Sequence, residues 1–273
     1  MDAGVGAQRS VGAVKLAVRQ QAGRTVLERL HQAGALRLRM VRAEQDGFAT
    51  AILLNTGGGV AGGDDYRVDL DVGAEARLVI SSQGAERIYR AGVIDAPARI
   101  ELRVMVAARA MMEWLPQETI LFDQAAMARR MRVDLDITSR YLGIEALVFG
   151  RAAMGERVHF LDFSDRVEIH RDGRLVYMDR LRPPADFTYA QERAAMLGGA
   201  TAMATVILAE PDAERWLEPV RAVLGNAQAG ASSWNQLLIV RMLAPSGEAL
   251  RYEVQRVLTV LREGRAMPRV WAC

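Results

Sequence analysis

The sequence predicts a mainly β protein of stacked antiparallel sheets, with two helices in its C-terminal half. Three observations predict this fold. Apolar and polar residues alternate with period two through much of the first two thirds of the chain, as they do in strands that bury one face. Turn-forming residues separate these runs. Helical spacing of the apolar residues is confined to the last third, so the chain lacks the regular strand–helix alternation of a parallel α/β fold.

Six segments show the alternation that a half-buried strand requires. They are residues 14–18, 36–40, 66–72, 100–106, 131–137 and 167–169. Gly73-Ala74 ends one of these runs. Asp172-Gly173 lies between residues 167–170 and 175–178 as the expected turn of a β-hairpin. The apolar members of each run, Ile137 included, are expected to share one face of their strand.

The last third contains two helical segments with a strand between them. Residues 212–224 place apolar side chains on one face, although Pro219 predicts a kink or a break into two short turns. Residues 236–243 predict a buried strand. Ser246 is the expected N-cap of the second helix, and Gly264 is its expected end. The apolar stripe of this helix consists of Leu250, Val254, Val257, Leu258 and Leu261.

Composition excludes several classes of function. The 273 residues include 35 Lys and Arg and 33 Asp and Glu, for a formal net charge of +2, which argues against nucleic-acid or anionic-membrane binding. Lys15 is the only lysine, so nearly all positive charge is arginine, which suits pairing with carboxylates but also follows from a GC-rich genome. The single cysteine, Cys273, allows no intrachain disulfide, and no signal peptide or membrane span is visible. We therefore expect a cytoplasmic protein.

A glycine-rich segment at residues 53–64 invites comparison with phosphate-binding loops. A P-loop needs Lys and then Ser or Thr after its last glycine, whereas Asp64 and Asp65 follow here. A dinucleotide-binding turn must open a helix, whereas a strand is expected at residues 66–72. The glycines are better explained by positive φ and close packing at a tight strand connection. Asp64 either caps backbone N–H groups or faces a partner.

A series of short motifs extends from this loop in both directions along the chain. Its members are Gly23-Arg24-Thr25-Val26-Leu27, Thr56-Gly57-Gly58, Gly62-Gly63-Asp64, Gly73-Ala74, Ser81-Ser82-Gln83, Ile88-Tyr89-Arg90, Trp114-Leu115-Pro116-Gln117, Phe122, Glu145, Gly150-Arg151, Gly155-Glu156, Asp179-Arg180-Leu181, Val240-Arg241 and Pro268-Arg269-Val270-Trp271. In order and spacing, the series resembles the UreD (UreH) family of urease accessory proteins, over about residues 10–272. Arg87, where the family pattern has lysine, and Gly59-Val60-Ala61, in place of a more apolar stretch, depart from it.

The resemblance implies one UreD-like domain over residues 1–273. Its fold would be mainly β, with stacked antiparallel or mixed sheets wound in a helical-like path and two α-helices in the C-terminal half. It also implies a non-enzymatic scaffold or metallochaperone. Such proteins bind the urease apoprotein and UreF, which recruits the nickel-carrying GTPase UreG, and they assist nickel insertion into the urease active site. GTP would then belong to UreG, in agreement with the missing P-loop, and no nucleic-acid or membrane partner is implied.

The histidines do not form a pattern typical of a tight nickel site. Stable nickel sites favour imidazole or thiolate ligands, but His31, His159 and His170 show no spacing that would bring two of them onto one face. Cys273 at the end of the sequence is more readily explained as incidental. We therefore expect no tightly bound metal or other cofactor, and at most transient contact with Ni²⁺.

Three carboxylates within the family-like motifs suggest a weaker kind of ion contact. We hypothesise that Asp64, Glu145 and Glu156 line or flank a hydrated route for Ni²⁺, because a path that passes an ion onward must release what it admits. The alternative is that Glu145 and Glu156 form structural salt bridges with arginines such as Arg151 and Arg157, since buried carboxylates need a partner.

Two other functional hypotheses remain open. Ser81-Ser82 and the histidines could nominally form a hydrolase site, although no G-x-S-x-G or H-E-x-x-H motif is present. A β-sandwich interaction domain with no role in metal transfer is the third possibility.

Purification with and without the partner proteins separates these hypotheses. A scaffold is expected to be poorly soluble alone and to form a stable complex with UreF. A chain that is soluble alone and turns over a small molecule would instead favour an enzyme.

Overall fold

The computed structural model describes residues 9–41, 47–92, 95–151, 154–225 and 227–272. One sheet contains β1 (Val11–Gln21), β2 (Arg24–Gly34), β5 (Asp65–Val72), β8 (Ala98–Val106), β11 (Ala125–Leu135), β13 (Leu161–Arg171) and β14 (Arg174–Leu181). The other contains β3 (Leu36–Met40), β4 (Ala49–Asn55), β6 (Arg77–Ser82), β7 (Glu86–Ile88), β9 (Met111–Leu115), β10 (Thr119–Leu121), β12 (Arg140–Phe149), β15 (Ala202–Ala209), β16 (Ala229–Trp234) and β17 (Leu237–Ala244). The helices are α1 (Phe187–Glu192), α2 (Leu217–Leu224) and α3 (Gly247–Leu261), with 3₁₀ turns η2 (Ala213–Trp216) and η3 (Arg269–Ala272).

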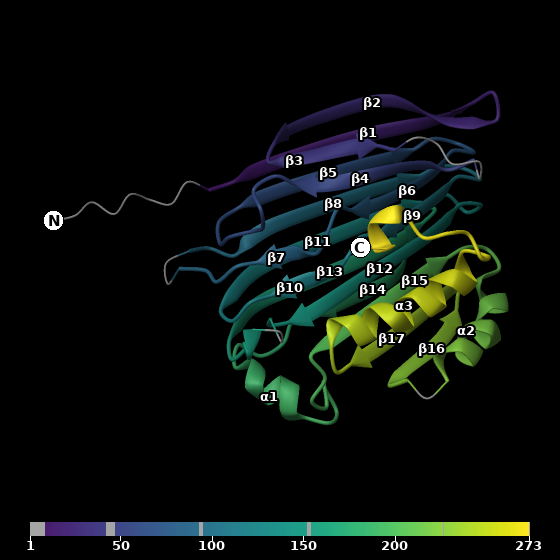
Figure 1. Ribbon diagram of the computed structural model, residues 1–273. Helices are drawn as coiled ribbons and strands as arrows, with labels where there is room; N and C mark the ends of the chain where they lie inside the picture. Colours follow the sequence, from purple (N-terminus) through teal and green to yellow (C-terminus); the bar gives the residue numbers. More distant parts are fainter. Residues whose placement is uncertain (1–8, 42–46, 93–94, 152–153, 226, 273) are drawn as a thin grey trace.

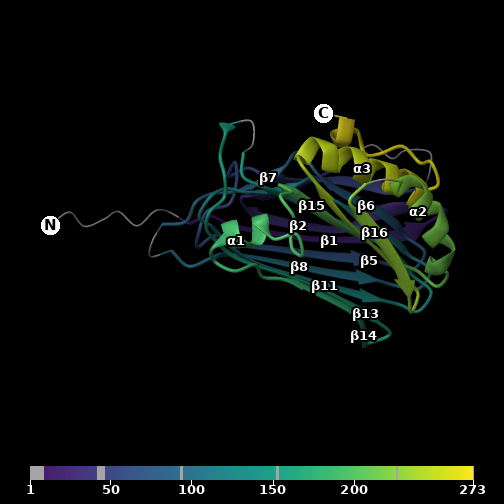
Figure 2. The same cartoon turned by 90° about the horizontal axis from the view of Figure 1, so that it is seen from below.

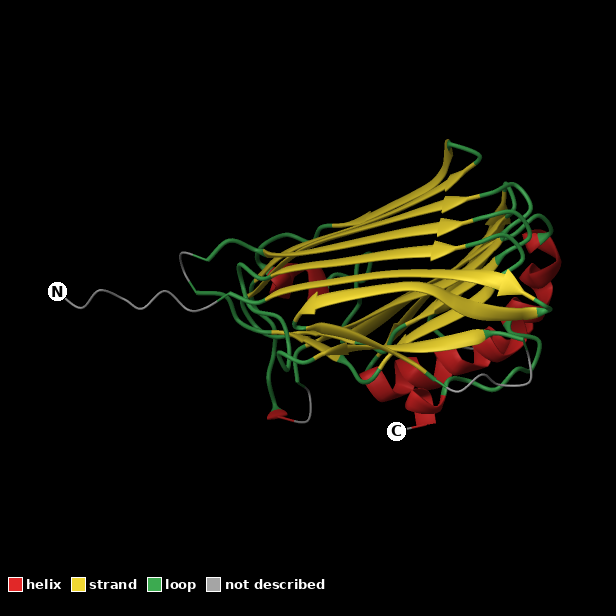
Figure 3. Ribbon diagram, turned by 90° about the horizontal axis from the view of Figure 1, so that it is seen from above, coloured by secondary structure: helices red, strands yellow, loops and turns green. Residues whose placement is uncertain are grey.

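The two sheets are stacked face to face, and α2 and α3 lie on one side of the stack (Figures 1 and 3). The seven-stranded sheet has the order β14-β13-β11-β8-β5-β1-β2. The ten-stranded sheet has the order β16-β17-β15-β12-β9-β6-β4-β3, with β10 beside β12 and β7 beside β10. The predicted mainly β fold, with stacked mixed sheets and two helices in the C-terminal half, is confirmed. A third helix, the six-residue α1, is additional.

From β4 to β13 the chain passes back and forth between the sheets. Strands β4, β6, β9 and β12 belong to one sheet, and β5, β8, β11 and β13 belong to the other. Successive strands within each sheet therefore run in the same direction, and their pairings are parallel. Antiparallel pairing, which the alternation pattern favoured, is found instead toward the sheet edges. Alternation reports which face is buried and carries no information on strand direction.

The ten-stranded sheet is the middle layer of the molecule. On β12, Tyr141, Leu147 and Phe149 belong to the apolar core between the sheets. Leu142 and Ile144, on the opposite face of the same strand, belong to a second core beneath α2 and α3. Figure 2 shows these helices against the outer face of this sheet. Among the described residues, no helix is long and apolar enough to cross a membrane.

The predicted C-terminal elements form as expected. Ser246 caps α3, since its hydroxyl accepts a hydrogen bond from the Ala249 N–H at 3.1 Å. All five residues of the predicted stripe are buried. Pro219 lies in the first turn of α2, where its missing N–H is tolerated, and the preceding turn is the separate η2. The predicted strand at residues 236–243 is β17.

The six alternating runs all lie in strands, with one error at the end of a run. Strand β11 ends at Leu135, and Ile137 is 57% exposed in the turn that follows, so its predicted place in the core is wrong. The predicted hairpin is confirmed: Asp172 and Gly173 join β13 to β14 with φ of 48° and 73°. Cys273 lies outside the described residues.

Candidate functional site

The connections between the sheets differ sharply at the two ends of the stack. From β4 to β13, crossings from the seven-stranded to the ten-stranded sheet are the short segments 73–76, 107–110 and 136–139. Crossings in the other direction are the longer segments 56–64, 83–97, 116–124 and 150–160. Because the crossing strands are parallel within each sheet, these longer segments all lie at one end, which we call the loop end (Figure 1). Six of the fourteen motifs found in the sequence lie wholly in these four segments, and two more extend into them.

The glycine-rich loop packs against the side chain of Tyr89. Gly59 has a φ of +150°, and a Cβ there would lie 2.3 Å from the Tyr89 ring. The Tyr89 hydroxyl donates a hydrogen bond to the carbonyl of Gly58 at 2.8 Å. The backbone of Val60 bonds on both sides of Ile88, to Arg87 and Tyr89. Close packing at a tight connection therefore accounts for these glycines.

The other loop-end motifs extend this packing. The Tyr89 ring meets Phe122 edge to face, with centroids 5.2 Å apart, and the Arg151 guanidinium lies 4.4 Å from the Phe122 ring centroid. Arg151 pairs with Glu156 at 2.9 Å, which lowers the pKa of that carboxyl. The predicted structural salt bridge of Glu156 is thus confirmed.

Asp64 is held entirely by its own surroundings. One carboxylate oxygen accepts from the Ser10 N–H at 2.7 Å, and the other accepts from the Ala61 N–H at 2.8 Å. The side chain is buried, and it ties the glycine-rich loop to the start of β1. Of the two roles considered for Asp64, the geometry is that of the backbone cap.

The remaining motif residues have structural positions. Gly62 and Gly150 are buried, Gly57 and Gly63 lie in the turns of the glycine-rich loop, and Arg90 forms a backbone bridge to Ala125. At the C-terminal motif, Pro268 is buried and Arg269 is exposed. The Trp271 indole donates to the carbonyl of Leu115 at 3.1 Å. The Gln117 amide donates to the carbonyl of Val270 at 2.7 Å. These bonds fasten the chain's last described turn to the Trp114–Gln117 motif.

Glu145 lies apart from this packing, in the interior between the two sheets. Its carboxylate pairs with Arg129 of the facing sheet and accepts a hydrogen bond from the Trp114 indole at 3.2 Å. Arg129 also pairs with Asp165, with 2.9 Å between Nε and Oδ1. The alternative of a structural salt bridge is therefore confirmed for Glu145 too, but its partner is Arg129 and not Arg151 or Arg157, because β12 directs it inward while those two arginines lie in the loop after that strand. We call Glu145, Arg129 and Asp165 the interior ion group.

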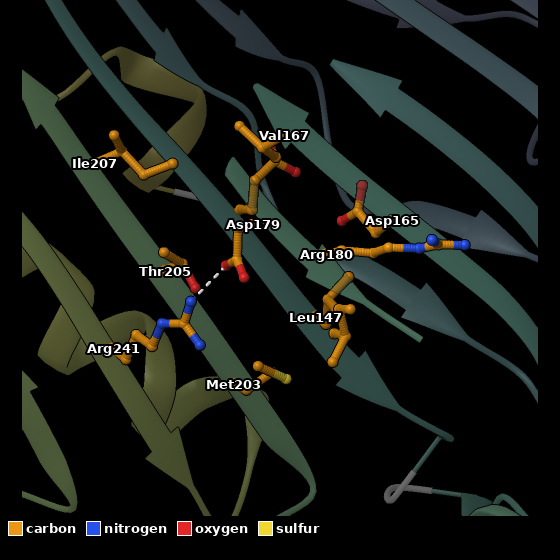
Figure 4. A pocket seen from close by; sticks show the side chains of 11 residues that line it. Leu147, Asp165, Val167, Asp179, Arg180, Met203, Thr205, Ile207 and Arg241 are labelled. Atoms are coloured by element: carbon orange, nitrogen blue, oxygen red, sulfur yellow. Dashed lines mark ion pairs between the residues drawn. The ribbon is translucent and has the colours of Figure 1, made fainter. Parts of the chain in front are cut away.

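A small cavity adjoins the interior ion group (Figure 4). Its volume is about 70 Å³, room for roughly two water molecules. Glu145 and Asp165 line it together with Asp179 and Arg241, which form an ion pair at 2.8 Å. The Tyr177 hydroxyl donates to the same Asp179 carboxylate at 3.2 Å. Three carboxylates thus share this space with the guanidinium groups of Arg129 and Arg241, and Arg180 also lines the cavity.

Glu145 is the carboxylate least compensated by its partners. Burial, with the nearby charge of Asp165, raises its pKa from 4.5 to about 7, despite the opposing effects of Arg129 and the Trp114 N–H. Its Oε2 atom is buried and accepts no hydrogen bond of regular geometry among the described residues. One guanidinium serves two carboxylates here, so one of them retains capacity to bind a cation or a proton.

The three carboxylates predicted to mark an ion route do not converge. Asp64 and Glu156 belong to loop-end segments, whereas Glu145 is in the interior. Across the described ranges, no three His, Cys, Asp or Glu side chains gather where they could hold a metal ion. His31 and His159 are exposed, and His170 lies on the outer side of β13, beside Glu168.

The partners of Glu145 were not identified from the sequence. Each of these partners is a charged residue two positions along its strand from an apolar residue that faces inward. Asp165, for example, lies between Phe163 and Val167. The partners are Arg129, Asp165, Asp179 and Arg241. A charge on the apolar face of an alternating strand is the signal that could have revealed them.

The fold and its interior define a class of protein. It is a β protein of two stacked sheets, with no assembled metal site among its described residues and a weakly compensated carboxylate between its sheets.

Comparison with known proteins gives the family. The model of the UreD urease accessory protein family matches residues 10–272. A urease accessory protein UreD of Rhizobium leguminosarum bv. trifolii is 41% identical over 269 residues, covering 98% of this chain and 97% of the relative. The Azorhizobium caulinodans UreD is 40% identical, covering 97% of each chain. The chain therefore belongs to the UreD family of urease accessory proteins.

Replacement of Gly59 tests the packing of the loop end. Gly59→Ala should lower the free energy of unfolding by about 2–4 kcal/mol, because the new Cβ meets the Tyr89 ring and the backbone is held at positive φ. Gly84→Ala is the matched control, since nothing lies within 4 Å of a Cβ there. Denaturant titration of both variants makes the measurement, and equal stabilities would contradict the packing described.

The raised pKa of Glu145 predicts a specific pH dependence of stability. The folded state binds a proton at Glu145 more tightly than the unfolded state, whose pKa is near 4.5. This tighter proton binding stabilises the folded state. The stabilisation is fully present below pH 4.5 and is lost as pH rises through about 7. We expect the melting temperature to fall over about pH 5–8 more steeply in the wild type than in Glu145→Gln. The two chains differ only at residue 145, so parallel curves would contradict the assignment.

Proposed function

We propose that this protein is a non-enzymatic scaffold that binds the urease apoprotein and the UreF–UreG complex, and assists nickel insertion into the urease active site. Membership of the UreD family supports a role in urease maturation. The relatives are urease accessory proteins by name. UreF, UreG, the apoprotein and the nickel cargo are parts of the proposal that come from the family resemblance in the sequence.

The observation that carries the nickel proposal is the position of Glu145. Nickel is cargo in this scheme and must be released, so its ligands should be few and weak. A buried carboxylate that shares one guanidinium with Asp165 offers such a ligand. Asp64 and Glu156 are committed to backbone caps and a salt bridge. We therefore retain them as flanking residues only and place the main role on Glu145.

The cavity beside Glu145 constrains how an ion could pass. Room for about two water molecules is too little for an ion with a full shell of six waters. An entering Ni²⁺ would exchange part of its shell for oxygens of Glu145, Asp165 and Asp179. Each of these carboxylates already has an arginine partner, and competition from Arg129 and Arg241 would keep the ion weakly bound. Ionisation of Glu145 adds the negative charge that favours entry.

Replacement of Glu145 tests this proposal in cells that express the urease operon. Glu145→Gln keeps the shape of the side chain but removes its charge. We expect urease activity and the nickel content of purified urease to fall by about tenfold, a typical effect of replacing a group that supports a metal. Glu218→Gln is the control, since that carboxylate is 77% exposed on α2, and it should activate urease as the wild type does.

Complex formation must be measured in the same strains. Co-purification of the Glu145→Gln chain with UreF, UreG and urease at wild-type yield would assign the loss to ion passage rather than folding or docking. Full urease activation by a well-folded Glu145→Gln chain would remove Glu145 from the route. Small-molecule turnover by the purified chain alone would instead contradict the scaffold proposal.

A further inference from the structure

One corner of the outer face of the seven-stranded sheet carries arginines without partners. On three neighbouring strands, Arg130 of β11 lies directly opposite Arg166 of β13, which lies opposite Arg180 of β14. Arg99 of β8 lies one row away, opposite Ala128. Among the described residues, Arg99, Arg130 and Arg180 make no ion pair or side-chain hydrogen bond. Arg166 pairs with Glu168, yet its Nε is buried and unsatisfied.

The rest of this face is arranged differently. Lys15 pairs with Asp69, Arg67 with Asp65, Arg103 with Glu101, and Arg132 with Asp134. In these neighbouring rows, each of the four basic residues therefore forms an ion pair with a carboxylate on its own strand or on the next strand. Like charges directly opposite one another destabilise a sheet. The arginine row is thus an exception that the fold itself does not require.

The four arginines border a shallow trough in the sheet surface. Its floor includes the small side chains of Ala128 and Ser164, which lie opposite each other on β11 and β13. Its volume is about 450 Å³, and it is open to solvent. Glu101 also lines it, and Asp162 lies one row beyond Ser164 on β13. In Figure 4, Arg180 extends away from the interior pair of Asp179 and Arg241. We call this feature the arginine trough.

We propose that the arginine trough is a docking site for an acidic segment of a partner protein. Guanidinium groups bind carboxylates through two parallel hydrogen bonds, and three of these four have no internal partner. The trough lies on the outer face of the seven-stranded sheet, although Arg129 also lines it and Arg180 also lines the cavity beside Glu145. Peptide binding by the full chain does not depend on nickel transfer, so the inference can be tested separately from the nickel proposal.

The shape of the trough favours a peptide over a small anion. Neighbouring strands are about 4.8 Å apart, so the row Arg130–Arg166–Arg180 spans roughly 10 Å. A single phosphate would need guanidinium groups that converge on one point. Carboxylates on one face of an extended segment recur about every 7 Å, a spacing that can engage successive arginines of the row.

Binding of a fluorescein-labelled peptide of ten glutamates to the full chain tests the proposal, with a ten-glutamine peptide as the neutral probe. The double variant Arg130→Gln, Arg180→Gln should bind the acidic peptide at least about tenfold more weakly than the wild type. The control is the double variant Arg103→Gln, Arg132→Gln, which removes two paired arginines from the same face and should change binding by less than about twofold.

Melting temperatures of the wild type and both double variants are measured alongside. The trough variant should be as stable as the wild type or more so, because like-charge repulsion is relieved.

Several outcomes would overturn the proposal. Equal losses in the two double variants would mean that only overall charge matters. No measurable binding at physiological salt would remove the site, as would equal binding of the glutamine peptide. Displacement of the peptide by millimolar inorganic phosphate would indicate a small-anion site. Tighter, Arg130- and Arg180-dependent binding of a DNA duplex of equal charge would indicate a polynucleotide partner.

Discussion

The repeated crossing of the chain between two facing sheets constrains every other feature of this structure. Each crossing places the next strand opposite the last, so strands from both sheets contribute one face to the same interior. A charged residue that is buried in the inward phase, such as Glu145, is removed from water and must find its partner inside. Arg129, Glu145 and Asp165 meet that requirement jointly, across the two sheets. Since one guanidinium serves two carboxylates, the requirement is met incompletely, and Glu145 keeps a raised pKa.

The same crossings give the two ends of the molecule different connections. Short turns at one end only reverse the chain, whereas the long segments at the other end carry the packing of Tyr89, Phe122 and Arg151. These contacts join the described parts of three of the long segments to one another.

Much of the fold follows from local patterns. Alternation identified buried faces such as Tyr66, Val68, Leu70 and Val72, because burial on one side of a strand imposes period two whatever the strand pairs with. The cap at Ser246, the stripe of α3 and the break at Pro219 could be predicted because each depends on a few adjacent residues. Parallel pairing of the strands could not be predicted, since the direction of a strand depends on which sheet each crossing enters. Ile137 was misplaced because alternation continued past the point where Asp136 and Thr138 form a turn.

The site was less predictable than the fold. Glu145 was identified only through a family-like motif, and its partners Arg129 and Asp165 lie 16 and 20 positions away in sequence. Asp64 and Glu156 were grouped with it because all three stand in similar motifs, but motif membership does not bring side chains together. The structure separates one buried, weakly compensated carboxylate from two carboxylates that stabilise loops.

Anomalous X-ray scattering at the nickel edge, from crystals soaked in millimolar Ni²⁺, tests most directly whether the inter-sheet interior admits the ion. We predict a partly occupied nickel peak in the cavity beside Glu145 and Asp165, absent from crystals of the Glu145→Gln chain. Nickel confined to the outer surface, for example at the exposed His159 and Asp123 pair, with the interior empty in both chains, would contradict it.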